Sequence, residues 1–224
     1  MTLAELIAQF RTDADDKEAP YLSEDEDVTL WLNEAEDEAA IRASLIHEAS
    51  NADICEIDVT AGTSVYPLHA AVIYVTNAWF TPAGSTNEIP LDLTDRIEQD
   101  RVRPGWRRLT NVPCGAIQND TTIQLTCLPN TDGLLRIECY RLPLQPMVLA
   151  ESDDTYPEIG AIHHRHLVYW ALQRCYRRPD AELLNESAAE RAEALFVAHF
   201  GLSVDADMRR SFQANRPLFN KAVW

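Results

Sequence analysis

The stretch SEDEDVTLWLNEAEDEAAIRASLIHEASNADICEIDVT, residues 23–60, decides the fold because the spacing of its apolar residues changes within it. Up to Ala49, apolar side chains recur every three or four positions, which predicts a helix of about 25 residues. Ser23, followed three residues later by Glu26, predicts a capping box at its start. From Asp53, apolar and acidic residues alternate, as in a strand with one exposed face. A helical segment therefore passes directly into a β-rich one.

The same two patterns organise the rest of the chain. Helical spacing is found before this stretch, where Thr2 and Glu5 predict a second capping box, and returns only after about 90 residues of strand-like sequence. Helices that flank a β-rich segment need each other to bury their apolar faces. We therefore predict an α+β fold, a helical bundle interrupted by an inserted antiparallel β-domain and followed by an extended C-terminal tail. The predicted ranges are 1–52 and 155–201 for the bundle, 53–150 for the β-domain and 202–224 for the tail.

A β-hairpin is predicted within the inserted domain. The segment TTIQLTCLPNTDGLLRIECYRLP, residues 121–143, contains two alternating runs around the loop PNTDG. Pairing across this loop places six apolar side chains on one face, which supports the register. They are Ile123, Leu125, Cys127, Leu135, Ile137 and Cys139.

The charge of the chain is concentrated near its N-terminus. The formal net charge is −17, and residues 1–58 carry 17 acidic side chains against 3 basic ones. Such a segment repels phosphates, so it disfavours a nucleic-acid-binding surface there. It suits a solvated face, a basic protein partner or a channel wall along which DNA slides without adhering.

The cysteine pattern and the hydropathy of the chain indicate the cellular compartment. The five cysteines form no CxxC pair, and no apolar segment is long enough to span a membrane. No secretory signal is apparent at the N-terminus. We expect a cytosolic protein with reduced, mostly buried thiols and no membrane association.

Three histidines in IGAIHHRHLVYWALQRCYRR, residues 159–178, raise the question of a metal site. On a helix His163 and His166 share a face, His164 points away, and Cys175 is three turns distant. Zinc needs a third and usually a fourth ligand, and no HExxH spacing is present. We predict a role in packing or at an interface, with no metal and no cofactor.

Catalysis has little support in the sequence. Carboxylates cluster at 95–100 and at 153–154, where acids commonly cap helices. No GxSxG, phosphate-binding loop or dinucleotide turn occurs, and only seven glycines are present. We predict that the protein is not an enzyme.

A basic cluster lies within the predicted β-domain. It contains Arg96, Arg101, Arg103, Arg107 and Arg108 around Trp106, and three nearby acids lower its net charge to +2. It is a candidate contact with the acidic N-terminal region of a neighbouring copy, which would be head-to-tail. A solvated loop and a nucleic-acid contact are the alternatives.

Four segments together resemble the adaptor proteins of tailed bacteriophages, the head-to-tail connector or head-completion proteins that dock beneath the portal. They are LWLNEAEDEAAIRASLI at 30–46, CEIDVTAGTSVYPL at 55–68, RLP at 141–143 and AIHHRHLVYWAL at 161–172. The resemblance covers most of residues 22–200. It rests on the order and texture of these segments and not on a catalytic signature.

The resemblance implies a structural virion protein at the neck, assembled in the host cytoplasm. It implies a ring of about twelve subunits around the genome channel, through which DNA passes without sequence-specific binding. The β-domain would face a downstream tail or nozzle protein, and the C-terminal tail would clasp the portal protein. Aromatic and basic residues of the tail are the candidate portal anchors: Arg209, Arg210, Phe212, Arg216, Leu218, Phe219 and Trp224. The alternative for the tail is packing on its own bundle.

Two rival functions remain at this stage. One is a tail or baseplate component whose β-domain binds another protein or a carbohydrate. An exposed aromatic loop would favour it, with Trp79, Phe80 and Trp106 as possible members. The other is a metal-dependent enzyme built on the helix that contains the three histidines.

Overall fold

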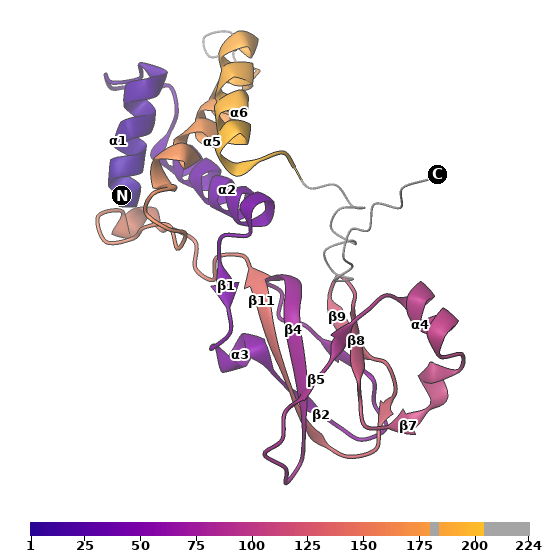
Figure 1. Cartoon of the computed structure of the whole chain (residues 1–224). Helices are drawn as coiled ribbons and strands as arrows, with labels where there is room; N and C mark the ends of the chain where they lie inside the picture. The colour runs from indigo at the N-terminus through magenta and orange to yellow at the C-terminus, as the bar shows by residue number, and fades with distance from the viewer. Residues whose placement is uncertain (180–183, 204–224) are drawn as a thin grey trace, which may run out of the picture. The chain divides into compact units, whose positions relative to one another are not determined.

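The structure of the chain is a computed structural model that describes residues 1–179 and 184–203 (Figure 1). The described residues combine six α-helices with antiparallel sheets, so the predicted α+β class is confirmed. Their contacts divide them into two compact units. The helical unit comprises residues 1–46 and 142–203, and the β unit comprises residues 47–141.

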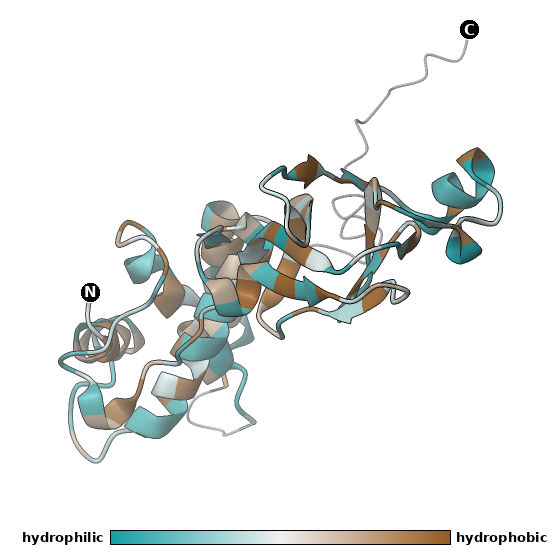
Figure 2. Cartoon of the chain, turned by 90° about the horizontal axis from the view of Figure 1, so that it is seen from below, coloured by the Kyte–Doolittle hydropathy of each residue, from teal (hydrophilic) through white to brown (hydrophobic). Residues whose placement is uncertain are grey.

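The helical unit is organised around α5 (His164–Tyr176). This helix contacts α1 (Leu3–Ala14), α2 (Asp25–Ala43) and α6 (Glu186–Phe200), while the short 3-10 helix η2 (Leu149–Glu151) contacts α2. In Figure 2 the helices carry both hydrophobic and hydrophilic residues, as expected of helices that bury one face. The apolar faces form one core, whose largest fully buried side chains are Phe10, Phe196, Leu3, Leu6, Leu32 and Leu167.

The two predicted capping boxes have different outcomes. Thr2 and Glu5 form theirs at the start of α1, where each side chain accepts the backbone N–H of the other. The predicted box at Ser23 is wrong, because α2 begins after Glu24 without a side-chain cap. The Ser23 hydroxyl instead lies 3.5 Å from the sulfur of Cys175. Three acids in the first turn of α2 interact favourably with the helix dipole in place of a cap.

Two helix boundaries also differ from the prediction. The helix α2 ends at Ala43, before the apolar pattern does, because Ser44 adopts a left-handed conformation with φ of 51°. The helix α5 begins at His164, so His163, which we expected on the same helix as His166, precedes its first turn. The preceding backbone N–H groups of Glu158 and Ile159 donate to the buried carboxylate of Glu36 instead. Burial raises the pKa of Glu36 to about 7.

The β unit contains two main sheets and a short parallel pair. In the first sheet β1 (His47–Glu48), β11 (Gly133–Arg141), β4 (Val72–Pro82) and β5 (Ile89–Pro90) are neighbours in that order, and β2 (Glu56–Val59) also pairs with β11. In the second sheet the order is β3 (Val65–Pro67), β9 (Thr122–Leu125), β8 (Gly115–Gln118) and β6 (Asp92–Leu93). The pairings of β6 with β8 and of β7 (Thr110–Asn111) with β10 (Leu128–Pro129) are parallel. Short helices α3 (Ala52–Cys55), α4 (Arg96–Val102) and η1 (Trp106–Arg108) complete the unit.

The predicted hairpin across PNTDG is wrong, although its six inward side chains are all buried. The strand β9 pairs with β3 and β8, whereas β11 pairs with β1, β2 and β4. Alternation determines which face of a strand is buried but does not choose the strand alongside it. At Gly133 an added Cβ would lie 2.4 Å from the carbonyl oxygen of Thr81, so the close pairing of β11 with β4 requires glycine there.

The buried amide of Gln118 connects the two sheets. Its Oε1 accepts the N–H of Val75 at 2.7 Å, and its Nε2 donates to the carbonyl of Ile73 at 3.2 Å. Both partners belong to β4, while Gln118 ends β8 in the other sheet. A single side chain therefore satisfies two backbone groups that a neighbouring strand would otherwise pair.

A buried ion pair joins the points where the chain enters and leaves the β unit. The guanidinium of Arg141, at the end of β11, lies 3.2 Å from Glu48 Oε2 on β1. The other carboxylate oxygen, Oε1, accepts the backbone N–H groups of Ala49, Ser50 and Asn51 and the Ser50 hydroxyl, at 3.0–3.1 Å. The hydrogen bond from the Ser50 N–H is the largest of the causes that lower the pKa of Glu48 to about 2.

This carboxylate gives the protein an acid-sensitive contribution to stability. A pKa below the usual 4.5 means that Glu48 stabilises the fold above pH 4.5 and loses that effect as the pH falls toward 2. We expect Glu48→Gln to lower the free energy of unfolding at pH 7 by about 2–3 kcal/mol and to flatten its pH dependence between 4.5 and 2. Urea unfolding at a series of pH values measures both effects. The exposed Glu56, changed to Gln, is the matched control, and equal losses in the two variants would contradict the assignment.

Candidate assembly surfaces

The three histidines at 163, 164 and 166 contribute to helix packing. His163 Nδ1 lies 2.9 Å from His199 Nε2 on α6, and the rings of His166 and His199 stack with centroids 3.5 Å apart. His164 points elsewhere and lies 2.9 Å, through Nε2, from the carbonyl of Ile159. Burial, with His199 nearby, lowers the pKa of both His163 and His166. Within the described ranges, no three His, Cys, Asp or Glu side chains gather as a metal site.

The sequence did not predict the involvement of His199. It lies 33 residues after His166 on a separate helix, and only the packing of α6 against α5 brings the rings together. A helical pattern indicates which face of a helix is buried but not which residues of another helix meet it. The last turn of α6 is thus held against the first turn of α5 by aromatic stacking.

The predicted basic cluster forms an exposed lobe, which we call the basic lobe (residues 95–109). The helix α4 has no buried residue, and Ile97 and Val102 on it are 81% and 65% exposed. Trp106 is fully buried and anchors the lobe, because its Nε1 donates to Asp100 Oδ1 at 2.8 Å. The basic lobe is therefore exposed on α4 and fixed at its base.

The five arginines of the lobe have unequal partners. Arg101 pairs with Glu98 at 2.7 Å, and Arg107 forms a two-bond pair with Asp100. That pair with Arg107 lowers the pKa of Asp100. Arg96 donates to the Asn119 amide oxygen at 2.9 Å. Arg103 and Arg108, like Arg96, form no ion pair with any described carboxylate.

The acids of the N-terminal region are also concentrated on one exposed stretch, which we call the acidic segment (residues 13–30). It carries eight carboxylates and a single basic side chain, Lys17. Leu22 and Leu30 within it are 47% and 56% exposed. Five exposed carboxylates form no ion pair with a described residue: Asp13, Asp15, Glu18, Glu24 and Glu26.

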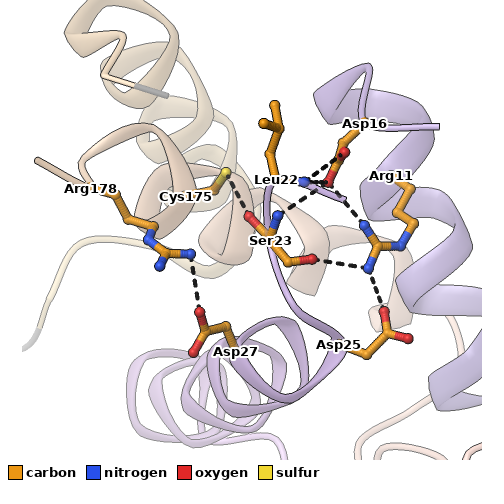
Figure 3. Close-up of polar contacts among 8 residues, drawn as sticks. All are labelled: Arg11, Asp16, Leu22, Ser23, Asp25, Asp27, Cys175 and Arg178. Carbon is orange, nitrogen blue, oxygen red and sulfur yellow. Dashed lines mark hydrogen bonds and ion pairs between the residues drawn. The ribbon is translucent and has the colours of Figure 1, made fainter. Parts of the chain in front are cut away.

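Arg11 fixes the conformation of the acidic segment (Figure 3). Its guanidinium donates to Asp16 Oδ2 at 2.9 Å, to the Ser23 carbonyl at 3.0 Å and to the Asp25 carboxylate. It also lies 3.5 Å from the ring centroid of Tyr21, a cation–π contact. Asp16 in turn accepts the N–H groups of Leu22 and Ser23. One buried arginine therefore orders both ends of the connection between α1 and α2.

Two contacts hold the same segment against α5 and the residues that follow it. The Ser23 hydroxyl meets the Cys175 sulfur, and Arg178 donates to Asp27 at 3.0 Å (Figure 3). The backbone that carries the exposed carboxylates of the acidic segment is thus held in one conformation.

The aromatic residues required by the carbohydrate-binding rival are not exposed as a group. Phe80 and Trp106 are fully buried, and Trp79 is half-buried beside the guanidinium of Arg136. These three residues form no aromatic platform. The predicted portal anchors between Arg209 and Trp224 lie outside the described residues.

Each unit thus has one exposed charged surface, the acidic segment in the helical unit and the basic lobe in the β unit. The family model described as SU10 adaptor protein matches residues 1–218. The chain therefore belongs to this family of phage head-to-tail adaptors, structural components of the virion, as the sequence resemblance predicted. No curated protein matches it. No helix among the described residues is both long and apolar enough to cross a membrane.

The fixed state of the acidic segment depends on Arg11. Replacing Arg11 with Met leaves the buried carboxylate of Asp16 without its cation, so we expect a loss of about 3 kcal/mol in the free energy of unfolding. We also expect faster amide hydrogen exchange across residues 16–23. Arg174→Met is the control, because Arg174 pairs with Glu34 at the surface, where loss of an ion pair changes stability by about 1 kcal/mol or less. Equal losses in the two variants, with unchanged exchange, would contradict this account.

Proposed function

We propose that the chain is the adaptor that forms a ring beneath the portal and links the capsid to the tail around the DNA channel. The observation that carries this proposal is the family match across residues 1–218. The rigid basic lobe and acidic segment support it, because ring assembly needs two different complementary surfaces on each subunit. In this ring of about twelve subunits, one per portal subunit, the five arginines of the lobe lie at subunit contacts.

In this proposal the inserted β-domain and the C-terminal tail have different partners. The tail clasps the portal protein, and the β-domain meets the downstream tail or nozzle protein. Genomic DNA passes through the ring without sequence-specific binding, which the net charge of −17 supports. The ring belongs to the virion neck and assembles in the host cytoplasm.

The sequence of the tail supports its role as the portal anchor. Phe212, Phe219 and Trp224 supply aromatic groups, and Arg209, Arg210 and Arg216 supply cations. Aromatic and arginine side chains contribute most of the binding energy in many interfaces. A tail or baseplate component is the alternative function, and the burial of Phe80 and Trp106 argues against its carbohydrate-binding form.

Truncation tests the clasp directly. A chain that ends at Leu202 should lose at least about 100-fold in affinity for portal rings, measured by cosedimentation, because several anchor residues are removed together. Full-length Phe212→Ala/Phe219→Ala/Trp224→Ala should lose a comparable amount. The control is Gln213→Ala/Asn215→Ala in the same tail. Undiminished affinity of the truncated chain would exclude the clasp.

A further inference from the structure

The basic lobe combines an apolar centre with unsatisfied positive charge. Ile97 and Val102 are the two most exposed large apolar side chains of the β unit, and Arg103 and Arg108 are without carboxylate partners among the described residues. Interfaces between proteins typically place such apolar side chains inside a polar rim. A partner for this surface should therefore present apolar side chains flanked by carboxylates.

The acidic segment has the complementary composition. Leu22 is 47% exposed and lies between Glu18 and Glu24, and Leu30 follows one turn into α2. The ion pairs of Arg11 and Arg178 hold the backbone without using the carboxylates of Glu18 or Glu24. Because the segment is ordered before binding, little conformational entropy is lost in docking it.

We infer that the basic lobe of one subunit binds the acidic segment, residues 13–30, of a second copy of this chain. The leucines of the segment meet Ile97 and Val102, while Glu18 and Glu24 pair with Arg103 and Arg108. The contact joins two different surfaces, so it can repeat from subunit to subunit, and in the proposed adaptor ring this repetition closes around the channel. This inference rests on the proposed adaptor function and specifies the subunit contact within it.

A charge-swap experiment tests the contact. Arg103→Glu/Arg108→Glu makes the lobe acidic, and Glu18→Arg/Glu24→Arg makes the segment basic. All four side chains are exposed, so stability should change little, which thermal unfolding verifies. Light scattering then measures the concentration of each protein that fills portal rings. We expect each variant alone to need about 10- to 100-fold more protein than the parent chain.

Mixing the two variants is the decisive arm. In an equimolar mixture each lobe can face a segment of opposite charge, so alternating subunits should restore filling to within about threefold of the parent chain. A single chain that carries all four substitutions should also be restored. Arg165→Glu/Arg191→Glu, which reverses two exposed arginines of the helical unit, is the control and should fill rings as the parent does.

The outcomes separate the contact from the proposed function. If the parent fills portal rings and both charge-reversed variants do so equally well, this contact is overturned while the adaptor function stands. If both variants fail and the mixture is not restored, the pairing of these two surfaces is overturned. A parent chain that does not associate with portal rings overturns the proposed function and this contact together.

Discussion

The buried pair of Glu48 and Arg141 is the contact on which the β unit most depends. It joins the first strand of the unit to the last residue of β11, the positions where the chain enters and leaves. An inserted unit needs its two ends close together if the chain is to return to the segment it left. A buried carboxylate is unfavourable without compensation. Here its two oxygens accept three backbone N–H groups, a hydroxyl and the guanidinium, so neither charge lacks a partner.

The same use of charge recurs in the helical unit. Arg11 donates to Asp16, Asp25 and the Ser23 carbonyl within the same chain. These bonds order a segment whose other carboxylates remain exposed. In the β unit Asp100 accepts hydrogen bonds from Trp106 and Arg107, and these bonds order the basic lobe. Internal ion pairs thus fix the backbone of two surfaces. The exposed charged side chains outside these pairs make the acidic segment negative and the basic lobe positive. An assembly protein gains from this division because binding energy is not spent on ordering loops.

The sequence predicted those features that depend on local chemistry. The capping box of Thr2 and Glu5 and the burial of the six alternating side chains follow from neighbouring residues. It did not predict features that depend on distant partners. The Ser23 hydroxyl contacts Cys175 and does not cap α2, and the Glu158 N–H before α5 donates to Glu36. Each contact joins residues more than a hundred positions apart. The strand partners of β11 and the stacking of His199 were not predicted, for the same reason. Arg101 and Arg107 of the basic cluster are paired with carboxylates, and only the structure distinguished them from the other three arginines.

The mass of the complex with portal rings tests the adaptor account most directly. Light scattering on the full-length chain, alone and then titrated onto matching portal rings, gives the number of copies bound at saturation. The account predicts a monomer in isolation and saturation at one copy per portal subunit. A small stable oligomer that is indifferent to portal rings would contradict it and would direct attention to what the β unit binds.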